Sequence, residues 1–426
     1  MLNKLKPKSE FSRNILTLMT GTTIAQAIPI AISPILTRIY TPEDFGIFAL
    51  FIAVTSIFGS IASGRYELAI MLPKKDEDAV NIFVLGLIIT CFITIILFIL
   101  MILFNDYLTK LLGNEEISFW LYFVPLTVFF TGLWNLLNYY NNRKKNYKDI
   151  ANAIVVKSIV LVIFQLIVGL LKHGVIGLIV GQIISQIIAN FKLLKNIYTD
   201  KKLILSISKL KIRALSRRYI SFPKHNMIPS MLDNLTSQLI YIIIPKIFSL
   251  LVSGQFFLAN RIVNLPVSLM SNSISQVYLQ KISENKNKKI KNMDIFISTI
   301  KKLFIIALPI GIAGFFLSPN IFLFIFGKEW IISGEIAQYL FLIFLVTFCI
   351  SPLSVSFIPS MDLKKSAYWQ YLYFCTSTLF FLITLYLKLD LKTFLIFFVI
   401  HEYVLYGIYL YLIILTIRKM DNNIKE

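Results

Sequence analysis

Residues 80–104 read VNIFVLGLIITCFITIILFILMILF. This stretch carries no charged side chain, and roughly 20 apolar residues in a helix are enough to cross the hydrocarbon core of a bilayer. Of the 426 residues in the chain, 57% are hydrophobic and only 15% are charged, which is not the composition of a soluble domain. The sequence therefore predicts an all-α integral membrane protein.

Twelve stretches of about this length are predicted to span the membrane. They are residues 15–36, 46–66, 80–104, 117–138, 150–171, 174–194, 222–248, 254–278, 295–317, 334–357, 367–387 and 393–416. The longest connection separates the first six from the last six. The predicted domains are an N-terminal six-helix bundle (1–200), a cytoplasmic amphipathic linker (201–221) and a C-terminal six-helix bundle (222–426).

The basic residues predict the orientation, because Lys and Arg are retained on the cytoplasmic side during insertion. Most of the 42 Lys and Arg residues lie in alternate connections, beginning with the N-terminal tail. The opposite connections hold only Arg38, Lys110, Lys172, Lys246, Lys328, Lys388 and Lys392. Both termini are therefore expected in the cytoplasm. The net charge of +20 follows this topology, so no nucleic-acid partner is expected.

The predicted linker has an apolar series at helical spacing, Leu203, Ile207, Leu210 and Ala214, interleaved with Lys and Arg. This pattern is typical of a helix that lies on an anionic membrane surface.

Several classes of chemistry have no sequence signature. There is no nucleotide-binding glycine motif, the three cysteines lie inside apolar stretches, and the three histidines show no zinc-site spacing. We expect no metal, no cofactor and no pump driven by nucleotide hydrolysis.

Away from the ends of the predicted spans, the ionisable residues expected within the hydrocarbon are few: Lys157, Asp233, Arg261, His401 and Glu402. Each costs roughly 2.5–3.5 kcal/mol at the centre of a membrane helix, so each should face a partner or a water-filled space. One interpretation is mutual neutralisation, for instance of Lys157 or Arg261 by Asp233. The other is that the two cations and Arg65, at the cytoplasmic end of the second span, line a central cleft and hold phosphate oxygens.

Further roles are predicted by residue type. Glu402, Asp233, His401 and Glu67 are candidates for coupling transport to protons, since buried carboxylates and imidazoles can titrate near neutral pH. Polar and aromatic residues of the fourth span are candidates for sugar contacts: Asn135, Asn138, Tyr139 and Tyr140.

The first eighty residues resemble a known family. The resemblance rests on Phe11-Ser-Arg-Asn14, Gly21-Thr22, Gln26, Pro34-Ile-Leu-Thr-Arg38, Tyr40-Thr-Pro-Glu-Asp-Phe-Gly46 and Arg65-Tyr-Glu67 through Ala69-Ile70 to Pro73. These motifs are similar to the start of the polysaccharide biosynthesis proteins, the Wzx-type O-antigen flippases of the multidrug/oligosaccharidyl-lipid/polysaccharide exporter superfamily. The similarity returns around residues 254–266.

The resemblance implies two six-helix bundles around a central cleft in a bacterial cytoplasmic (inner) membrane. It implies that an undecaprenyl-diphosphate-linked oligosaccharide crosses by alternating access, supplying a polysaccharide polymerase and chain-length machinery in O-antigen or lipopolysaccharide assembly. By analogy with related lipid flippases, Arg65 and Arg261 would bind the diphosphate, with Arg38 as a third candidate.

Two alternatives stay open at this point. A multidrug exporter of the same superfamily would use acidic residues such as Asp233 and Glu402 to attract cationic drugs. A membrane enzyme that transfers or polymerises sugars would need a sizeable outer loop carrying catalytic carboxylates, and the predicted outer connections are short. We therefore expect a transporter and not an enzyme.

Overall fold

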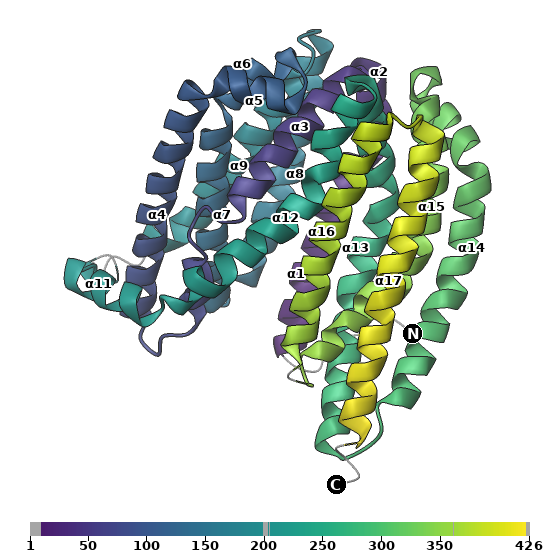
Figure 1. The fold of residues 1–426 in the computed structure, drawn as a ribbon. Helices are drawn as coiled ribbons and strands as arrows, with labels where there is room; N and C mark the ends of the chain where they lie inside the picture. The colour runs from purple at the N-terminus through teal and green to yellow at the C-terminus, as the bar shows by residue number, and fades with distance from the viewer. Residues whose placement is uncertain (1–9, 199–202, 204, 361, 423–426) are drawn as a thin grey trace. The chain divides into compact units, whose positions relative to one another are not determined.

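The computed structural model describes residues 10–198, 203, 205–360 and 362–422, and over these residues it is helical with no strand (Figure 1). The elements in chain order are α1 (Glu10–Ala31), α2 (Ser33–Ile39), α3 (Pro42–Gly59), η2 (Tyr66–Met71), α4 (Asp76–Leu103), α5 (Asn105–Leu112), η3 (Glu115–Ile117), α6 (Ser118–Leu121), α7 (Val124–Arg143), α8 (Tyr147–Leu170), α9 (Ile176–Tyr198), α11 (Lys209–Arg218), α12 (Ser221–Ile247), α13 (Leu250–Asn287), α14 (Met293–Phe326), η4 (Lys328–Trp330), α15 (Ile331–Ile350), η5 (Ser351–Phe357), α16 (Leu363–Leu387) and α17 (Leu391–Asn422). The predicted all-α class is confirmed.

The predicted membrane spans are recovered as long apolar helices. Within the described residues, 11 helices are long and apolar enough to cross a bilayer, or up to 12 if a bent pair is counted as one span. That pair is Glu115–Leu121 with Val124–Arg143, which meet at 52°. The chain is therefore a multi-pass membrane protein.

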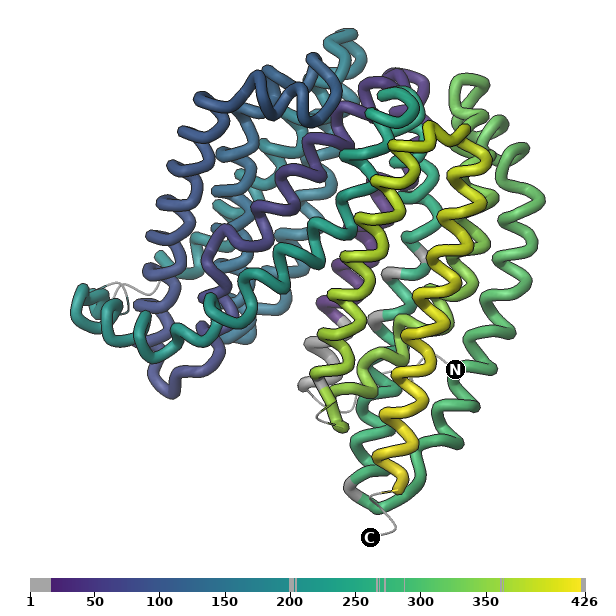
Figure 2. Tube along the Cα trace, in the orientation of Figure 1, coloured from purple at the N-terminus to yellow at the C-terminus, as the bar shows by residue number. Residues whose placement is uncertain are grey.

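The chain divides into two compact units, Met1–Lys246 and Ile247–Glu426, here called unit 1 and unit 2. In unit 1, α8 packs against α1 and α9, and α7 packs against α3, α4 and α9. In unit 2, α15 packs against α13, α14 and α17 (Figure 2). This division places α12, up to Lys246, with the helices before it, although its sequence makes it the first span of the predicted second half.

The start of α3 is fixed by local sequence. Thr41 and Asp44 form a reciprocal cap, in which each side chain accepts a hydrogen bond from the other residue's backbone N–H, at 3.2 and 3.0 Å. The preceding Tyr40 donates its hydroxyl to the Gln165 carbonyl of α8 at 2.5 Å. A Cβ at Gly177 would lie 2.0 Å from that hydroxyl, so only glycine leaves room for the ring.

The end of α3 differs from the prediction of a span over 46–66. The helix stops at Gly59, and turns lead to Gly64 and Arg65, whose backbones are left-handed with φ of 59° and 63°. This conformation is free for glycine but costs roughly 1–2 kcal/mol for other residues. Arg65 therefore lies on a strained turn and not on a helix face.

The linker also differs from its prediction. Residues 201, 202 and 204 lie outside the described residues. Leu203 and Leu205 are helical, the helical path breaks at residues 206–208, and helix α11 begins at Lys209. Ser208 is extended, and the Asn81 side chain of α4 binds the backbone of Ser206 and of Ser208 itself. The amide accepts from Ser208 N at 2.9 Å and donates to the Ser206 carbonyl at 3.2 Å.

Helix α11 turns a different face to the protein than its apolar series predicts. Leu210 is 81% exposed, whereas Leu215 is buried in a cluster with residues of η2 and α4. Lys211 pairs with Glu77 at 2.7 Å, and Tyr66 donates its hydroxyl to the Ser216 carbonyl at 3.0 Å. The linker helix is thus fixed to the first turn of α4, while α5 follows the opposite end of that helix (Figure 1).

Candidate functional site

The turn after α3 holds an ion pair. Arg65 Nη1 lies 3.2 Å from Glu67 Oε1, and the arginine side chain is 25% exposed while that of Glu67 is 2% exposed. Ser63 donates its hydroxyl to the second carboxylate oxygen at 2.5 Å. Arg65 Nε is buried with no hydrogen-bond partner among the described residues. Arg65 is therefore neutralised and held in place, with one donor left unused.

Lys157 is a different kind of cation. It lies within α8, is partly buried, and forms no ion pair or hydrogen bond with any residue that the structure describes. Its ammonium sits 5.7 Å from the centroid of the Trp134 ring in α7. A ring face at this distance stabilises a cation by about 0.5–2 kcal/mol but does not neutralise it.

The predicted sugar contacts divide between two faces of α7. Asn135, Asn138 and Tyr139 are partly exposed and follow Trp134 at helical spacing, so they share its face. Tyr140 is 1% exposed and packs edge-on against Phe83 of α4. Tyr140 therefore packs in the core between α7 and α4, and Asn135, Asn138 and Tyr139 are the more accessible of the four predicted sugar contacts.

In unit 2, Arg261 lies in the first third of α13. It is partly buried and has no ion pair or hydrogen bond within the described ranges. In unit 1, Asp233 of α12 is exposed, and its carboxylate likewise has no described partner. Lys157 and Asp233 thus do not neutralise each other. Arg38 is exposed in the last turn of α2, where a cation also complements the helix dipole.

A second polar cluster lies between α16 and α17 of unit 2. Glu402 is 3% exposed, and the Tyr373 hydroxyl donates to its two oxygens at 3.1 and 3.3 Å. His401 Nδ1 is 3.3 Å from the same carboxylate, while its Nε2 is buried without a partner among the described residues. His401 also stacks on Phe380, with ring centroids 5.2 Å apart. The structure thus places His401 and Glu402 in one cluster of unit 2, while Asp233 belongs to unit 1.

Three of these contacts were not predicted from the sequence. They are Trp134 beside Lys157, Ser63 on Glu67 and Tyr373 on Glu402, and a local sequence signal exists for the first two. Trp134 and Ser63 lie within one helical turn of residues already singled out. Tyr373 lies 29 positions from Glu402 on another helix, so no local pattern connects the two. Among the described residues, no group of three or more His, Cys, Asp or Glu is placed to hold a metal ion.

The sequence of the chain matches a known protein family. The family model for polysaccharide biosynthesis proteins matches residues 35–335, which is most of the chain. The chain belongs to the polysaccharide biosynthesis protein family. The matched region contains Arg65, Lys157 and Arg261. None of the curated proteins matches the chain.

Two solved structures with a fold similar to that of this chain are transporters. One is an inward-facing multidrug resistance MATE family transporter of the MOP superfamily, with 17% identity, TM-score 0.74 and coverage of 95% of this chain and 96% of that one. Another is a MOP superfamily transporter from Pyrococcus furiosus described as having a binding pocket of reverse polarity, with 17% identity, TM-score 0.66 and coverage of 97% and 96%. The fold is that of MOP superfamily transporters, and fold and family together support a membrane transporter.

Proposed function

We propose that this protein is a flippase for undecaprenyl-diphosphate-linked oligosaccharides, such as an O-antigen, capsule or related repeat unit. It would carry them by alternating access from the cytoplasmic to the outer leaflet of a bacterial cytoplasmic (inner) membrane, with both termini in the cytoplasm. A polysaccharide polymerase with its chain-length machinery would use the product. The proposal makes the protein a transporter and not an enzyme.

One observation carries the proposal: each unit holds, within a membrane-spanning helix, a cation with no carboxylate partner among the described residues. These cations are Lys157 and Arg261. A charge in this position is expensive, so it is expected where it binds an anion during function. A diphosphate offers several oxygens, which a guanidinium binds through two parallel hydrogen bonds and an ammonium binds as a point charge.

The face of α7 next to Lys157 supports the sugar part of the proposal. Asn135 and Asn138 carry amides that both donate and accept, and Trp134 and Tyr139 present aromatic rings. Sugar hydroxyls need donors and acceptors, while the apolar faces of the sugar rings pack on aromatic side chains. Arg65, already paired with Glu67, would contribute its unused Nε donor and would carry less of the diphosphate charge.

The test is an accumulation assay in cells that lack the gene. Lipid-linked repeat units should accumulate on the cytoplasmic face and disappear when the gene is restored. The Arg261→Ala variant should fail to restore transport while reaching the membrane in normal amount. Absence of accumulation in the deleted cells would reject the proposed substrate, and full rescue by Arg261→Ala would remove that residue from the site.

Drug export is the second candidate, and Asp233 is the observation that favours it. An exposed carboxylate without a partner in a spanning helix is suited to a cationic drug. A strain that overproduces the protein and shows raised resistance to cationic dyes, lost with Asp233→Asn, would support this function over the flippase.

A further inference from the structure

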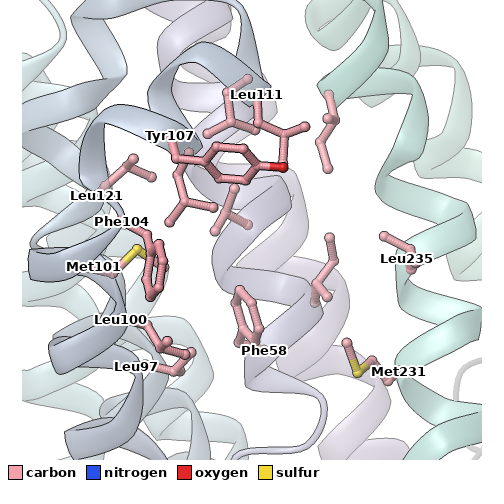
Figure 3. A pocket seen from close by; sticks show the side chains of 15 residues that line it. Phe58, Leu97, Leu100, Met101, Phe104, Tyr107, Leu111, Leu121, Met231 and Leu235 are labelled. Atoms are coloured by element: carbon pink, nitrogen blue, oxygen red, sulfur yellow. The ribbon is translucent and has the colours of Figure 1, made fainter.

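An apolar groove runs through unit 1 between α12 and the helices α3, α4 and α5, with a volume of about 380 Å³ (Figure 3). Its lining side chains are hydrophobic apart from the hydroxyl of Tyr107. Figure 3 shows residues of α4 and α5 on one side of the groove, Leu235 and Met231 of α12 on the other, and Phe58 between them.

The groove has a buried floor and an accessible rim. Leu97, Met101 and Leu121 are at most 6% exposed, so they form its floor. Leu100 and Phe104 at the rim are 40% and 49% exposed. A hydrophobic site of this kind, reachable from its rim in a membrane protein, is suited to hydrocarbon and not to water.

The length of the groove corresponds to one leaflet. Its lining residues on α12 extend from Met231 to Ile242, which at 1.5 Å per residue is about 16 Å. Half of the hydrocarbon core of a bilayer is roughly 15 Å thick. A volume of about 380 Å³ spread along this length leaves the width of one hydrocarbon chain beside the helix.

Helix α5 forms the end of the groove and is polar on its other side. Tyr107 and Leu111 face the groove, whereas the opposite face lines a polar pocket of about 630 Å³. The residues of the polar pocket are Asp106, Thr109, Lys110, Gly113, Asn114, Glu115 and Ser118. Lys246 of α12 packs on this pocket, because a Cβ at Gly113 would come within 2.7 Å of Lys246 Cγ.

We infer that the groove binds the polyprenyl tail of the lipid-linked substrate in the leaflet next to α5, an inference that rests on the proposed function. A groove of this volume accommodates a segment of one chain, and a polyprenyl diphosphate has a single chain next to its headgroup whereas a bilayer phospholipid has two. Lys110 and Lys246 lie at the depth where the diphosphate of such a lipid would emerge. Asp106, Asn114 and Glu115 supply acceptors for the hydroxyls of its first sugars.

Photochemical labelling of the full chain tests this inference, because α4 and the residue that caps its C-terminus offer two exposed phenylalanines, one at the groove and one away from it. Phe104 lies at the groove rim and is 49% exposed, and Phe92 is 63% exposed but does not line the groove. A p-benzoylphenylalanine replaces one or the other, and the protein is reconstituted in vesicles of phosphatidylethanolamine and phosphatidylglycerol with tagged undecaprenyl diphosphate. Transport of the sugar-bearing lipid by the wild-type chain is measured in the same vesicles.

We expect the ratio of undecaprenyl to phospholipid adducts to be higher at Phe104 than at Phe92 by at least about fourfold, the factor that one buried CH₂ group is worth. Adding Leu100→Trp, which fills the groove from its rim, should return the ratio to that of Phe92. Equal ratios at the two positions, or a ratio at Phe104 that Leu100→Trp leaves unchanged, would overturn the tail site even if transport is observed. Absence of wild-type transport would instead reject the proposed function.

Discussion

Arg65 and Lys157 are both cations of unit 1, but their surroundings differ. Arg65 lies on a left-handed turn outside the helix and is paired with Glu67, whose other oxygen is held by Ser63. Lys157 lies inside α8 next to the face of Trp134, and it has no carboxylate partner within the part of the chain that the structure describes. The charge of Arg65 is therefore compensated, whereas the charge of Lys157 is available to bind an anion.

The surroundings of Arg65 are those of a residue that stabilises the fold, and the surroundings of Lys157 are those of a residue that binds a substrate. Removing one member of a buried pair leaves an unpaired charge and destabilises the fold. Removing a cation that has no partner relieves a cost that the fold was carrying. The two sites should therefore respond in opposite directions to neutralising substitutions, which is testable residue by residue.

Neutralising Lys157 should have the largest effect on transport. The Lys157→Met variant loses charge-assisted contacts to the diphosphate, each worth about 1.5–3 kcal/mol, so transport should fall by about 10- to 150-fold. The melting temperature of the purified variant should stay the same or rise, and Lys157→Arg should retain most of the transport. Thermal unfolding together with the accumulation assay would check this, and loss of folded protein in Lys157→Met would contradict the comparison.

Glu67→Gln should act on stability first. It leaves the Arg65 guanidinium without its carboxylate, and breaking a buried pair costs about 3–5 kcal/mol, with the lower end expected here because Arg65 is 25% exposed. The matched control is the double variant Arg65→Gln with Glu67→Gln, which removes both charges and should recover part of the loss. A single variant as stable as the wild type, measured by thermal unfolding, would show that the pair is not structural.

Glu402→Gln tests the predicted coupling site in unit 2. A glutamine oxygen can still accept from the Tyr373 hydroxyl, so the unfolding free energy should change by only about 1 kcal/mol. Transport by the variant should no longer respond to an imposed proton gradient across a vesicle membrane. A response equal to that of the wild-type chain would exclude Glu402 from coupling.

The smallest effect is expected at the exposed pair of Lys211 and Glu77, which joins α11 to α4. The hydrogen bond from Lys211 to Glu77 raises the pKa of Lys211 above its usual value. Its contribution to stability is therefore present below the usual lysine pKa and is lost as the pH rises through the raised value. Lys211→Gln should barely change the melting temperature at pH 7, and a large loss there would show that α11 depends on this pair.

The long apolar stretches made the spans predictable, because a helix in lipid must be apolar over a known length. The turn at residues 60–65 was not predictable in this way, since Ile61 and Ala62 continue the apolar pattern past Gly59. The local series in the linker likewise predicted one helix through residues 203–214. The helical path instead breaks at residues 206–208, where the side chain of Asn81, distant in sequence, binds the backbone.

In the candidate site, too, the sequence predicted which residues matter but not the contacts that surround them. The cost of burying charge identified Lys157, Arg261 and Glu402 from the sequence, and the structure adds what surrounds each of them. Neighbouring residues such as Tyr139 and Tyr140 were indistinguishable by composition. Packing of α7 on α4 buries Tyr140 and leaves Tyr139 partly exposed.

Transport in reconstituted vesicles tests the central claim most directly. The assay follows a labelled undecaprenyl-diphosphate oligosaccharide as it becomes accessible on the opposite leaflet, for the wild-type chain and for Lys157→Met and Arg261→Met. The account predicts that both variants remain folded and that their rates fall to near the rate of protein-free vesicles. Wild-type rates in both variants would contradict the claim that these two cations bind the diphosphate.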